Sequence, residues 1–183
     1  MKKSQPTWTH VKDKLAGFDR QGLLALIQDL YAAYKDNRTF LHTRFGVGED
    51  ILEPYKRTIE RSISPDPGLS ARILDISVAK AKQAIVDYKK AVGDPAGLAE
   101  LTVFYCECAA GFCSDFGNDD ESYFGALLRV FEQAVIVANT LPSGSRDELI
   151  ARLDQVRIIS HKFGYGVGDT MDGILRASTE SGD

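Results

Sequence analysis

The sequence predicts an all-α fold, and three observations lead to it. Apolar residues recur at intervals of three and four along nearly the whole chain, which is typical of amphipathic helices. No stretch alternates between apolar and polar residues as a strand does, and no Asn-Gly or Asp-Gly turn separates two apolar runs. The chain has 183 residues, 44% hydrophobic and 26% charged, which suits a single domain over residues 1–183 with its own core. We expect seven or eight helices packed as antiparallel hairpins.

The expected helices follow one another with short gaps. A short helix is expected near Leu15, and flexible ends are expected at residues 1–6 and 178–183. The segment from about 123 to 141 is apolar on most faces, so we expect it to form the central hairpin with the segment from about 96 to 116. The amphipathic stripes cover residues 23–34, 51–63, 73–88, 98–116, 124–135, 149–163 and 171–175.

Capping residues predict where these helices begin. Pro95 directly follows Asp94, and proline suits the first position of a helix. Loops are expected at residues 64–68 and 142–144, where proline, serine and glycine cluster. The candidate N-caps, whose side-chain oxygens can accept the free amides of a first turn, are Asp19, Asp94, Asp119, Ser145 and Asp169.

The dipeptide Phe-Gly marks three of the expected helix ends. Glycine permits the left-handed backbone that closes a helix, so we predict three helix–turn–helix junctions with the aromatic ring packed under each turn. The dipeptides are Phe45-Gly46, Phe116-Gly117 and Phe163-Gly164.

One pattern of small and aromatic residues returns along the chain, which makes the array loosely similar to a helical repeat. The spacing is longer than that of a tetratricopeptide repeat, and the signature of its first helix is absent. The pattern occurs at Ala84, Tyr88 and Ala91 and again at Leu127, Phe131 and Ala134.

The three cysteines favour core packing over chemistry. Cys106, Cys108 and Cys113 lie within one apolar helical segment, and their odd number argues against a disulfide framework. Structural zinc sites use a different spacing and a second ligand pair. No known catalytic, nucleotide or metal motif is present. We therefore predict no cofactor, no metal and no assigned catalytic residue.

The glycine-rich segment from Gly164 to Thr170 is a candidate binding loop. Gly166 and Gly168 could let the backbone approach a ligand, and the helix that follows offers free amides to an anion. Asp169 at the start of that helix would repel a phosphate, so a structural turn is the favoured interpretation. His161, at the end of the preceding helix, is interpreted as a partner of the helix dipole.

Glu107 is the most unusual acidic residue, because it lies inside an apolar run. A buried carboxylate needs a partner, and we predict an ion pair with Lys80 or Lys82. The alternative is that Glu107 works with Asp119 and Asp120, and with His161 or a cysteine, in a small enzyme or a cation-binding site.

Charge is distributed unevenly along the chain. Residues 1–93 carry a net charge of +5 and residues 94–183 a net charge of −9, which together make the −4 of the whole chain. The basic half could face an anionic partner, the acidic half of the same chain, or a second copy in a homodimer.

Four segments carry a resemblance to a known family. They are Lys80–Lys89, Leu98–Leu101, Phe104-Tyr105-x-Glu107 with Phe116-Gly117, and Gly164–Thr170. Through them the region from Ser77 to Leu175 resembles an uncharacterised bacterial helical family, a domain of unknown function. The resemblance implies a helical fold and carries no established activity or site.

The expected function is a non-enzymatic module in which a groove between hairpins binds an unknown protein or peptide. The enzyme or cation-binding alternative is described above, and a third is nucleic-acid binding through the basic half, which the overall acidity disfavours. The N-terminus has no apolar run of a signal peptide, and no uncharged segment is long enough to span a bilayer. We therefore expect a cytoplasmic protein without a membrane partner.

Overall fold

The computed structural model describes residues 5–48, 50–63 and 76–180 and confirms the all-α fold. Within these residues there are nine helices and no strand, so the prediction of seven or eight was close. The helices are α1 (Trp8–Leu15), α2 (Arg20–Ala33), α3 (Lys35–Phe45), α4 (Glu53–Ile63), α5 (Val78–Ala91), α6 (Pro95–Phe116), α7 (Glu121–Ala138), α8 (Ser143–Ser160) and α9 (Val167–Glu180).

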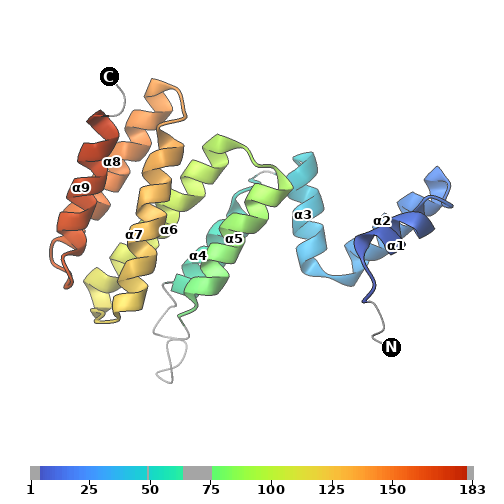
Figure 1. Ribbon diagram of the computed structural model, residues 1–183, viewed down its shortest axis with the longest axis horizontal. Coiled ribbons are helices and arrows are strands. Elements are labelled where there is room, and N and C mark those ends of the chain that lie inside the picture. Colours follow the sequence, from blue (N-terminus) through green and yellow to red (C-terminus); the bar gives the residue numbers. More distant parts are fainter. Residues whose placement is uncertain (1–4, 49, 64–75, 181–183) are drawn as a thin grey trace.

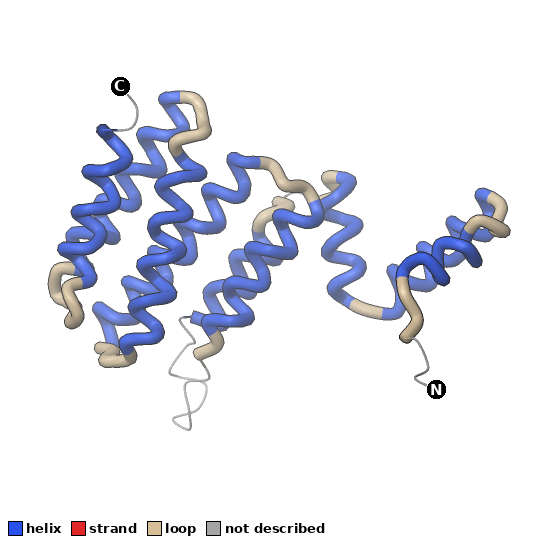
Figure 2. The backbone as a smooth tube through the Cα atoms, viewed as in Figure 1, coloured by secondary structure: helices blue, strands red, loops and turns tan. Residues whose placement is uncertain are grey.

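Helices α4–α9 form the body of the protein, and α1–α3 form an arm that projects from it (Figure 1). We call residues 5–48 the N-terminal arm. In the body, α6 packs against α7 as the predicted central hairpin, with α4 and α5 on one side of it and α8 and α9 on the other. Short loops join most of these helices, and neighbours run antiparallel (Figure 2).

The core lies where α6 and α7 meet their neighbours. The side chains of Leu101 and Cys106 on α6 and of Phe131 on α7 are completely buried. α6 buries residues on most of its faces because its sequence is apolar nearly all round. Tyr88 of α5 reaches α6 at Gly97, where a Cβ atom would overlap the phenol group. Glycine at this position is therefore what lets α5 and α6 pack closely.

The helix caps were predicted correctly at two positions. The side chain of Asp19 accepts the amide of Gly22, and that of Asp94 accepts the amide of Gly97, with Pro95 in the first helical position as expected. Ser77, which caps α5 by accepting the amide of Lys80, was not predicted.

Three predicted caps were wrong. Asp120, not Asp119, caps α7, since its Oδ1 accepts the amides of Ser122 and Tyr123. α8 begins at Ser143 rather than after Ser145, so the second predicted loop is largely helical. Asp169 lies in the first turn of α9, which begins two residues earlier. The predicted cap lies one residue from the observed one at α7 and three residues from it at α8, since the exact terminal residue of a helix is the least predictable part of it.

The Phe-Gly turns were predicted correctly in backbone at two of three positions, because at the third the positive φ angles belong to Tyr165 and Gly166 instead of Gly164. Gly46 and Gly117 have φ angles of 62° and 72°, in the left-handed region. However, Phe45 is 73% exposed and Phe116 is 50% exposed, so neither ring is packed under its turn. Only Phe163 is held as predicted, by stacking on Phe124 with ring centroids 5.8 Å apart.

The N-terminal part contains one more helix than the stripes indicated. Tyr34 adopts an extended backbone, with φ −139° and ψ 142°, and separates α2 from α3. α3 carries few apolar residues, so its periodicity is weak. At the other end, α9 continues to Glu180, past the start of the expected flexible end. The predicted loop at 64–68 and most of the two expected flexible ends lie outside the described residues.

Candidate functional site

The N-terminal arm carries most of the exposed apolar side chains. No residue of α1 or α2 is buried, and α3 buries only Thr43. Of the 17 large hydrophobic residues that are exposed in the described part of the chain, 12 belong to the arm. They are Trp8, Val11, Phe18, Leu23, Leu24, Ile27, Leu30, Tyr31, Tyr34, Phe40, Phe45 and Val47.

In α2 these residues form one continuous stripe, which we call the α2 stripe. Leu23, Ile27 and Leu30 are separated by four and three residues, which is the spacing of a coiled-coil seam. Leu24 and Tyr31 flank the same face, and both are exposed. The stripe therefore has the pattern of a helix–helix interface, although the described residues of the chain leave it exposed.

The arm is fixed to the body through its last helix. Arg44 Nη1 donates a hydrogen bond of 2.7 Å to the main-chain oxygen of Ala91 at the end of α5. Thr43, on the same turn, is the buried residue of the arm. Between α2 and α3, the hydroxyl of Tyr31 lies 2.9 Å from Nε2 of His42. These contacts orient the arm, and they leave the α2 stripe open.

The arm is also basic. Residues 5–48 contain six Lys and Arg against four Asp and Glu, a net charge of +2. Beyond the arm, basic residues of the same half are partly neutralised within the chain: Lys56 forms an ion pair with Glu100 at 2.6 Å, and Arg57 pairs with Glu53 at 2.7 Å. Lys56 thus joins the basic half of the chain to the acidic half within the body, and the arm keeps its excess of positive charge.

Glu107 forms an ion pair, and its partner is not the predicted one. Arg152 of α8 bonds both Glu107, at 2.7 and 2.8 Å, and Glu100, which lies two turns earlier on the same face of α6. Lys80 and Lys82 are exposed on α5, and the ion-pair partner of Glu107 is Arg152 instead. The prediction failed because Arg152 is 45 residues away in sequence, and only the packing of α8 on α6 brings the two together.

The electrostatics of this network follow from its position between α6 and α8. Burial alone would raise the pKa of Glu100, but hydrogen bonds from Arg152 and Lys56 outweigh it and hold that pKa below its usual value. The hydrogen bonds that Arg152 donates to Glu107 and to Glu100, that to Glu107 most of all, raise the pKa of Arg152. The guanidinium of Arg152 bonds both carboxylates, so the network links α8 to α6 and gives each of these charged groups a partner.

Asp119 and Asp120 are occupied by structural roles. The Asp120 carboxylate caps α7, and hydrogen bonds from Ser122 hold its pKa below the usual value. The main-chain oxygen of Asp119 accepts a hydrogen bond of 3.1 Å from the hydroxyl of Tyr165. Glu107 pairs with Arg152, and in the described part of the chain no cluster of three possible metal ligands contains Glu107, Asp119 or Asp120.

The glycine-rich loop between α8 and α9 has an unusual backbone. Tyr165 has a φ angle of 59°, and it is the one non-glycine residue with positive φ among those described. Gly166 follows with φ 67°. A left-handed tyrosine costs free energy, and the loop compensates through the hydroxyl bond to Asp119 and through packing of the ring on Phe124, with centroids 5.9 Å apart.

An open groove of about 630 Å³ lies between this loop and α7. Phe124 and Leu128 supply apolar surface, and Glu121 and Arg129 supply opposite charges. Ser122, Gly125, Tyr165 and Val167 complete its walls. This is the groove between helices that comes nearest to the expected one, but it is shallow and mixed in character.

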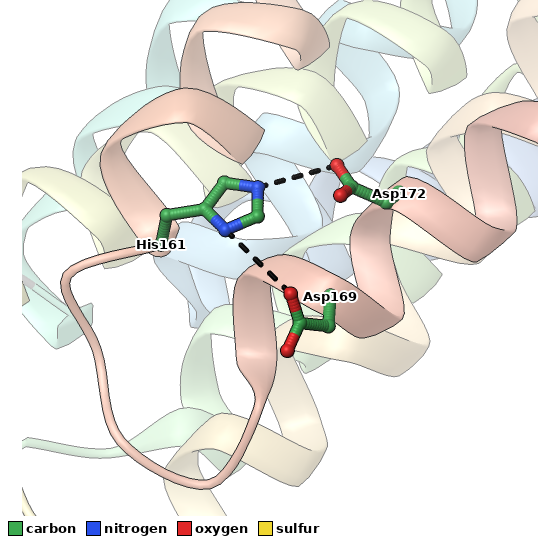
Figure 3. Close-up of side chains that lie close together, drawn as sticks. All are labelled: His161, Asp169 and Asp172. Carbon is green, nitrogen blue, oxygen red and sulfur yellow. Dashed lines mark hydrogen bonds and ion pairs between the residues drawn. The ribbon is translucent and has the colours of Figure 1, made fainter.

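The same loop brings His161 between two carboxylates of α9 (Figure 3). Its Nδ1 lies 3.8 Å from Oδ1 of Asp169, and its Nε2 lies 3.3 Å from Oδ1 of Asp172. Gly168 is what permits this, because a Cβ atom there would lie 2.7 Å from the imidazole ring. Arg157 of α8 bonds Asp172 at 2.7 Å and Asp154 at 2.8 Å. His161 and Asp169 were singled out from the sequence, whereas Asp172 and Arg157 were missed.

A spacing signal for Asp172 existed in the sequence. Asp169 and Asp172 are three residues apart, and residues at that separation share one face of a helix. Arg157 and His161 are four residues apart, so the sequence also predicts that they share a helix face. What the sequence could not reveal is that the turn folds these two faces against each other.

The cysteines behave as predicted, as small core residues. Cys106 and Cys113 are buried, and Cys108 is half-buried. Burial raises the pKa of Cys108 to about 12 and that of Cys113 to about 11. Thiols with such pKa values remain protonated at neutral pH, and a protonated thiol is neither a good nucleophile nor a good metal ligand.

No family model, no curated protein sequence and no solved structure matches this chain. The resemblance of residues 77–175 to an uncharacterised helical family therefore stays a prediction. In the described part of the chain, one helix, α6, is long and apolar enough to cross a membrane by length and composition, with a mean hydropathy of 1.2, and 67% of it is buried inside the protein. Core helices pass the same test, so the cytoplasmic location also stays a prediction.

Proposed function

We propose that this protein is an interaction module without catalytic activity of its own, and that its N-terminal arm is the binding element. The observation that carries the proposal is the α2 stripe, a helix face of coiled-coil spacing that nothing in the described chain covers. Exposed apolar patches of this kind mark protein–protein contacts in soluble proteins.

The lengths of the arm helices support this proposal. α1 has 8 residues and α2 has 14, and isolated helices shorter than about 12–15 residues are marginal in water. In most proteins a helix gains its stability from burying an apolar face, yet α1 and α2 have no buried residue. A binding partner that covers the α2 stripe would supply the missing stabilisation.

The occupant that fits best is a second copy of this chain. The α2 stripe is symmetric about Ile27, with Leu23 and Leu24 on one side and Leu30 and Tyr31 on the other. In an antiparallel dimer with its two-fold axis at Ile27, Leu23 and Leu24 of one copy would contact Leu30 and Tyr31 of the other. An isologous dimer requires this kind of self-complementary surface.

The experiment is sedimentation equilibrium of the full chain over a wide range of concentrations. The wild type is expected to form a dimer. Replacing Leu24→Glu and Ile27→Glu together should raise the dissociation constant by about a hundredfold or more, because each buried aliphatic side chain contributes about 1.5–3 kcal/mol and charge replaces it in both copies. Circular dichroism checks that the helical body remains folded.

A matched control uses apolar residues that are similarly exposed in the body. Val86→Glu with Ile158→Glu changes the charge equally, on α5 and α8, and should leave the dimer intact. A wild type that remains monomeric at every concentration would contradict the proposed second copy. So would a dimer that survives the substitutions in the α2 stripe.

A further inference from the structure

We propose that His161, Asp169 and Asp172 form a binding site for a divalent transition-metal cation of the Zn²⁺ class. One imidazole nitrogen and one oxygen from each carboxylate lie within 4.8 Å of one another. No other group of three such side chains is found in the part of the chain that the structure describes. The inference does not depend on the N-terminal arm.

The geometry requires only small movements. Zinc takes nitrogen and oxygen ligands at about 2.0–2.2 Å in a tetrahedron, which sets the ligand atoms about 3.4 Å apart. The His161 side chain is 40% exposed and Asp169 is 86% exposed, so both can rotate toward a shared ion. Figure 3 shows the imidazole lying between the two carboxylates, with Asp169 at the first turn of α9 and Asp172 one turn further along.

The local charge favours a dication. The ion-paired side chains around His161 are Asp154, Asp169 and Asp172, each negative, and Arg157, which is positive. With a neutral imidazole the sum is −2. A divalent cation would neutralise it, whereas an anion would be repelled.

Arg157 and Gly168 organise the site without being ligands. Arg157 Nη1 donates to Oδ1 of Asp172 at 2.7 Å and also lies 3.4 Å from Nε2 of His161, so it fixes the carboxylate beside the imidazole, as hydrogen-bonded ligating carboxylates are held in known metal sites. Gly168 lets the backbone of α9 pack directly on the imidazole. The ring is therefore placed before a metal arrives.

The donor set selects the kind of metal. Imidazole is a ligand of Zn²⁺ and of the other late transition metals, while Mg²⁺ and Ca²⁺ take oxygen ligands. Three protein ligands leave a fourth position for water, as in zinc sites that are open to a substrate. The competing arrangement is a protonated His161 that bonds both carboxylates and needs no metal.

The test is calorimetric titration of Zn²⁺ into the full chain after chelator treatment, in a reducing buffer. The wild type should bind one equivalent. Asp169→Asn should weaken the affinity for Zn²⁺ by about tenfold or more. The Asp169 side chain is exposed, so this substitution should leave the fold intact. His161→Gln should weaken the affinity for Zn²⁺ in the same way. Repeating the titration with Co²⁺ identifies the ligands, since nitrogen and oxygen ligands produce no sulfur-to-metal charge-transfer band.

Two control variants separate this site from general binding. Asp147→Asn removes an exposed acid elsewhere on α8, and His10→Gln removes an exposed histidine of the arm. Both should bind Zn²⁺ as the wild type does. The proposal is overturned if the wild type binds no Zn²⁺, if Asp169→Asn binds it equally well, or if the Co²⁺ complex shows thiolate ligation.

Discussion

Two arginines of α8 hold the acidic side chains that face them. Arg152 bonds Glu100 and Glu107, and Arg157 bonds Asp154 and Asp172. A guanidinium group presents several donors in one plane, so it can bond two carboxylates at once, which a lysine ammonium does less well. This is why the structure uses Arg152 where the sequence had suggested Lys80 or Lys82.

Removal of Arg152 should destabilise the protein. Arg152→Ala leaves two half-buried carboxylates without their shared partner, and we expect a loss of about 2 kcal/mol in the free energy of unfolding, between the values for exposed and buried pairs. Arg152→Lys should lose less. Arg146→Ala, which removes an exposed arginine of the same helix, should change little. Urea unfolding measures all three, and equal effects of Arg152→Ala and Arg146→Ala would contradict the role assigned to Arg152.

The same network predicts a pH dependence. The pKa of Glu100 is lower in the folded protein than its usual value of 4.5, so its contribution to stability is fully present above that value and is lost as the pH falls through the folded pKa. Wild-type stability should therefore decrease on acidification below about pH 4.5. In Glu100→Gln this decrease should be shallower. Identical pH profiles for the two proteins would show that Glu100 contributes nothing.

Two glycines of α6 should respond oppositely to the same substitution. Gly97→Ala places a Cβ atom against the phenol of Tyr88, and we expect a loss of about 2 kcal/mol or more. At Gly111 no atom lies within 4 Å of an added Cβ, so Gly111→Ala should stabilise the helix by about 0.5–1 kcal/mol. Thermal unfolding of the two variants measures the difference, and the same sign for both would contradict the packing of α5 on α6.

At the level of helices, the existence of elements was predictable and their boundaries were less so. The central hairpin of α6 and α7 was recognised because its apolar residues continue over several turns. The cap of α7 was misplaced by one residue, since Asp119 and Asp120 are both suitable N-caps. Only the backbone direction decides that the carboxylate of Asp120 meets the free amides while Asp119 turns its main-chain oxygen to Tyr165.

The cap assignment can be tested by comparing the two aspartates. Asp120→Ala removes the acceptor of the Ser122 and Tyr123 amides, so it should lower the urea midpoint of unfolding. Asp119→Ala should leave the midpoint nearly unchanged, because its hydrogen bond to Tyr165 uses the main-chain oxygen. The reverse order of effects would assign the cap to Asp119.

For the whole molecule, the sequence predicted helical stripes without showing which of them are buried. The stripe of α2 has the same periodicity as that of α7, yet α7 is covered by α6, α8 and α9, and α2 projects from the body. Periodicity states only that a helix face is apolar. Whether the chain itself covers that face depends on long-range packing, which the sequence does not show. The same packing brings Arg152 to Glu107 and His161 to Asp172, so the contacts of the candidate sites could not be predicted either.

The positive charge of the first half of the chain is divided between the body and the arm. Part of it is neutralised within the body, where Lys56 of α4 meets Glu100 of α6. Part of it remains on the arm, whose net charge of +2 lies beside its apolar residues. The surface that combines both properties is the one we assign to binding.

Hydrogen exchange of the amides of α2 measures whether the α2 stripe is buried between two copies of the chain. If the α2 stripe is buried between two copies, residues 20–33 should exchange slowly at high protein concentration and faster on dilution. In the Leu24→Glu and Ile27→Glu variant they should exchange rapidly at all concentrations, while the amides of α6 stay protected. If α2 exchanges at the rate of an unfolded chain at every concentration, the α2 stripe is not buried in a dimer. Protection of α2 that changes neither on dilution nor in the substituted protein would contradict the dimer as well.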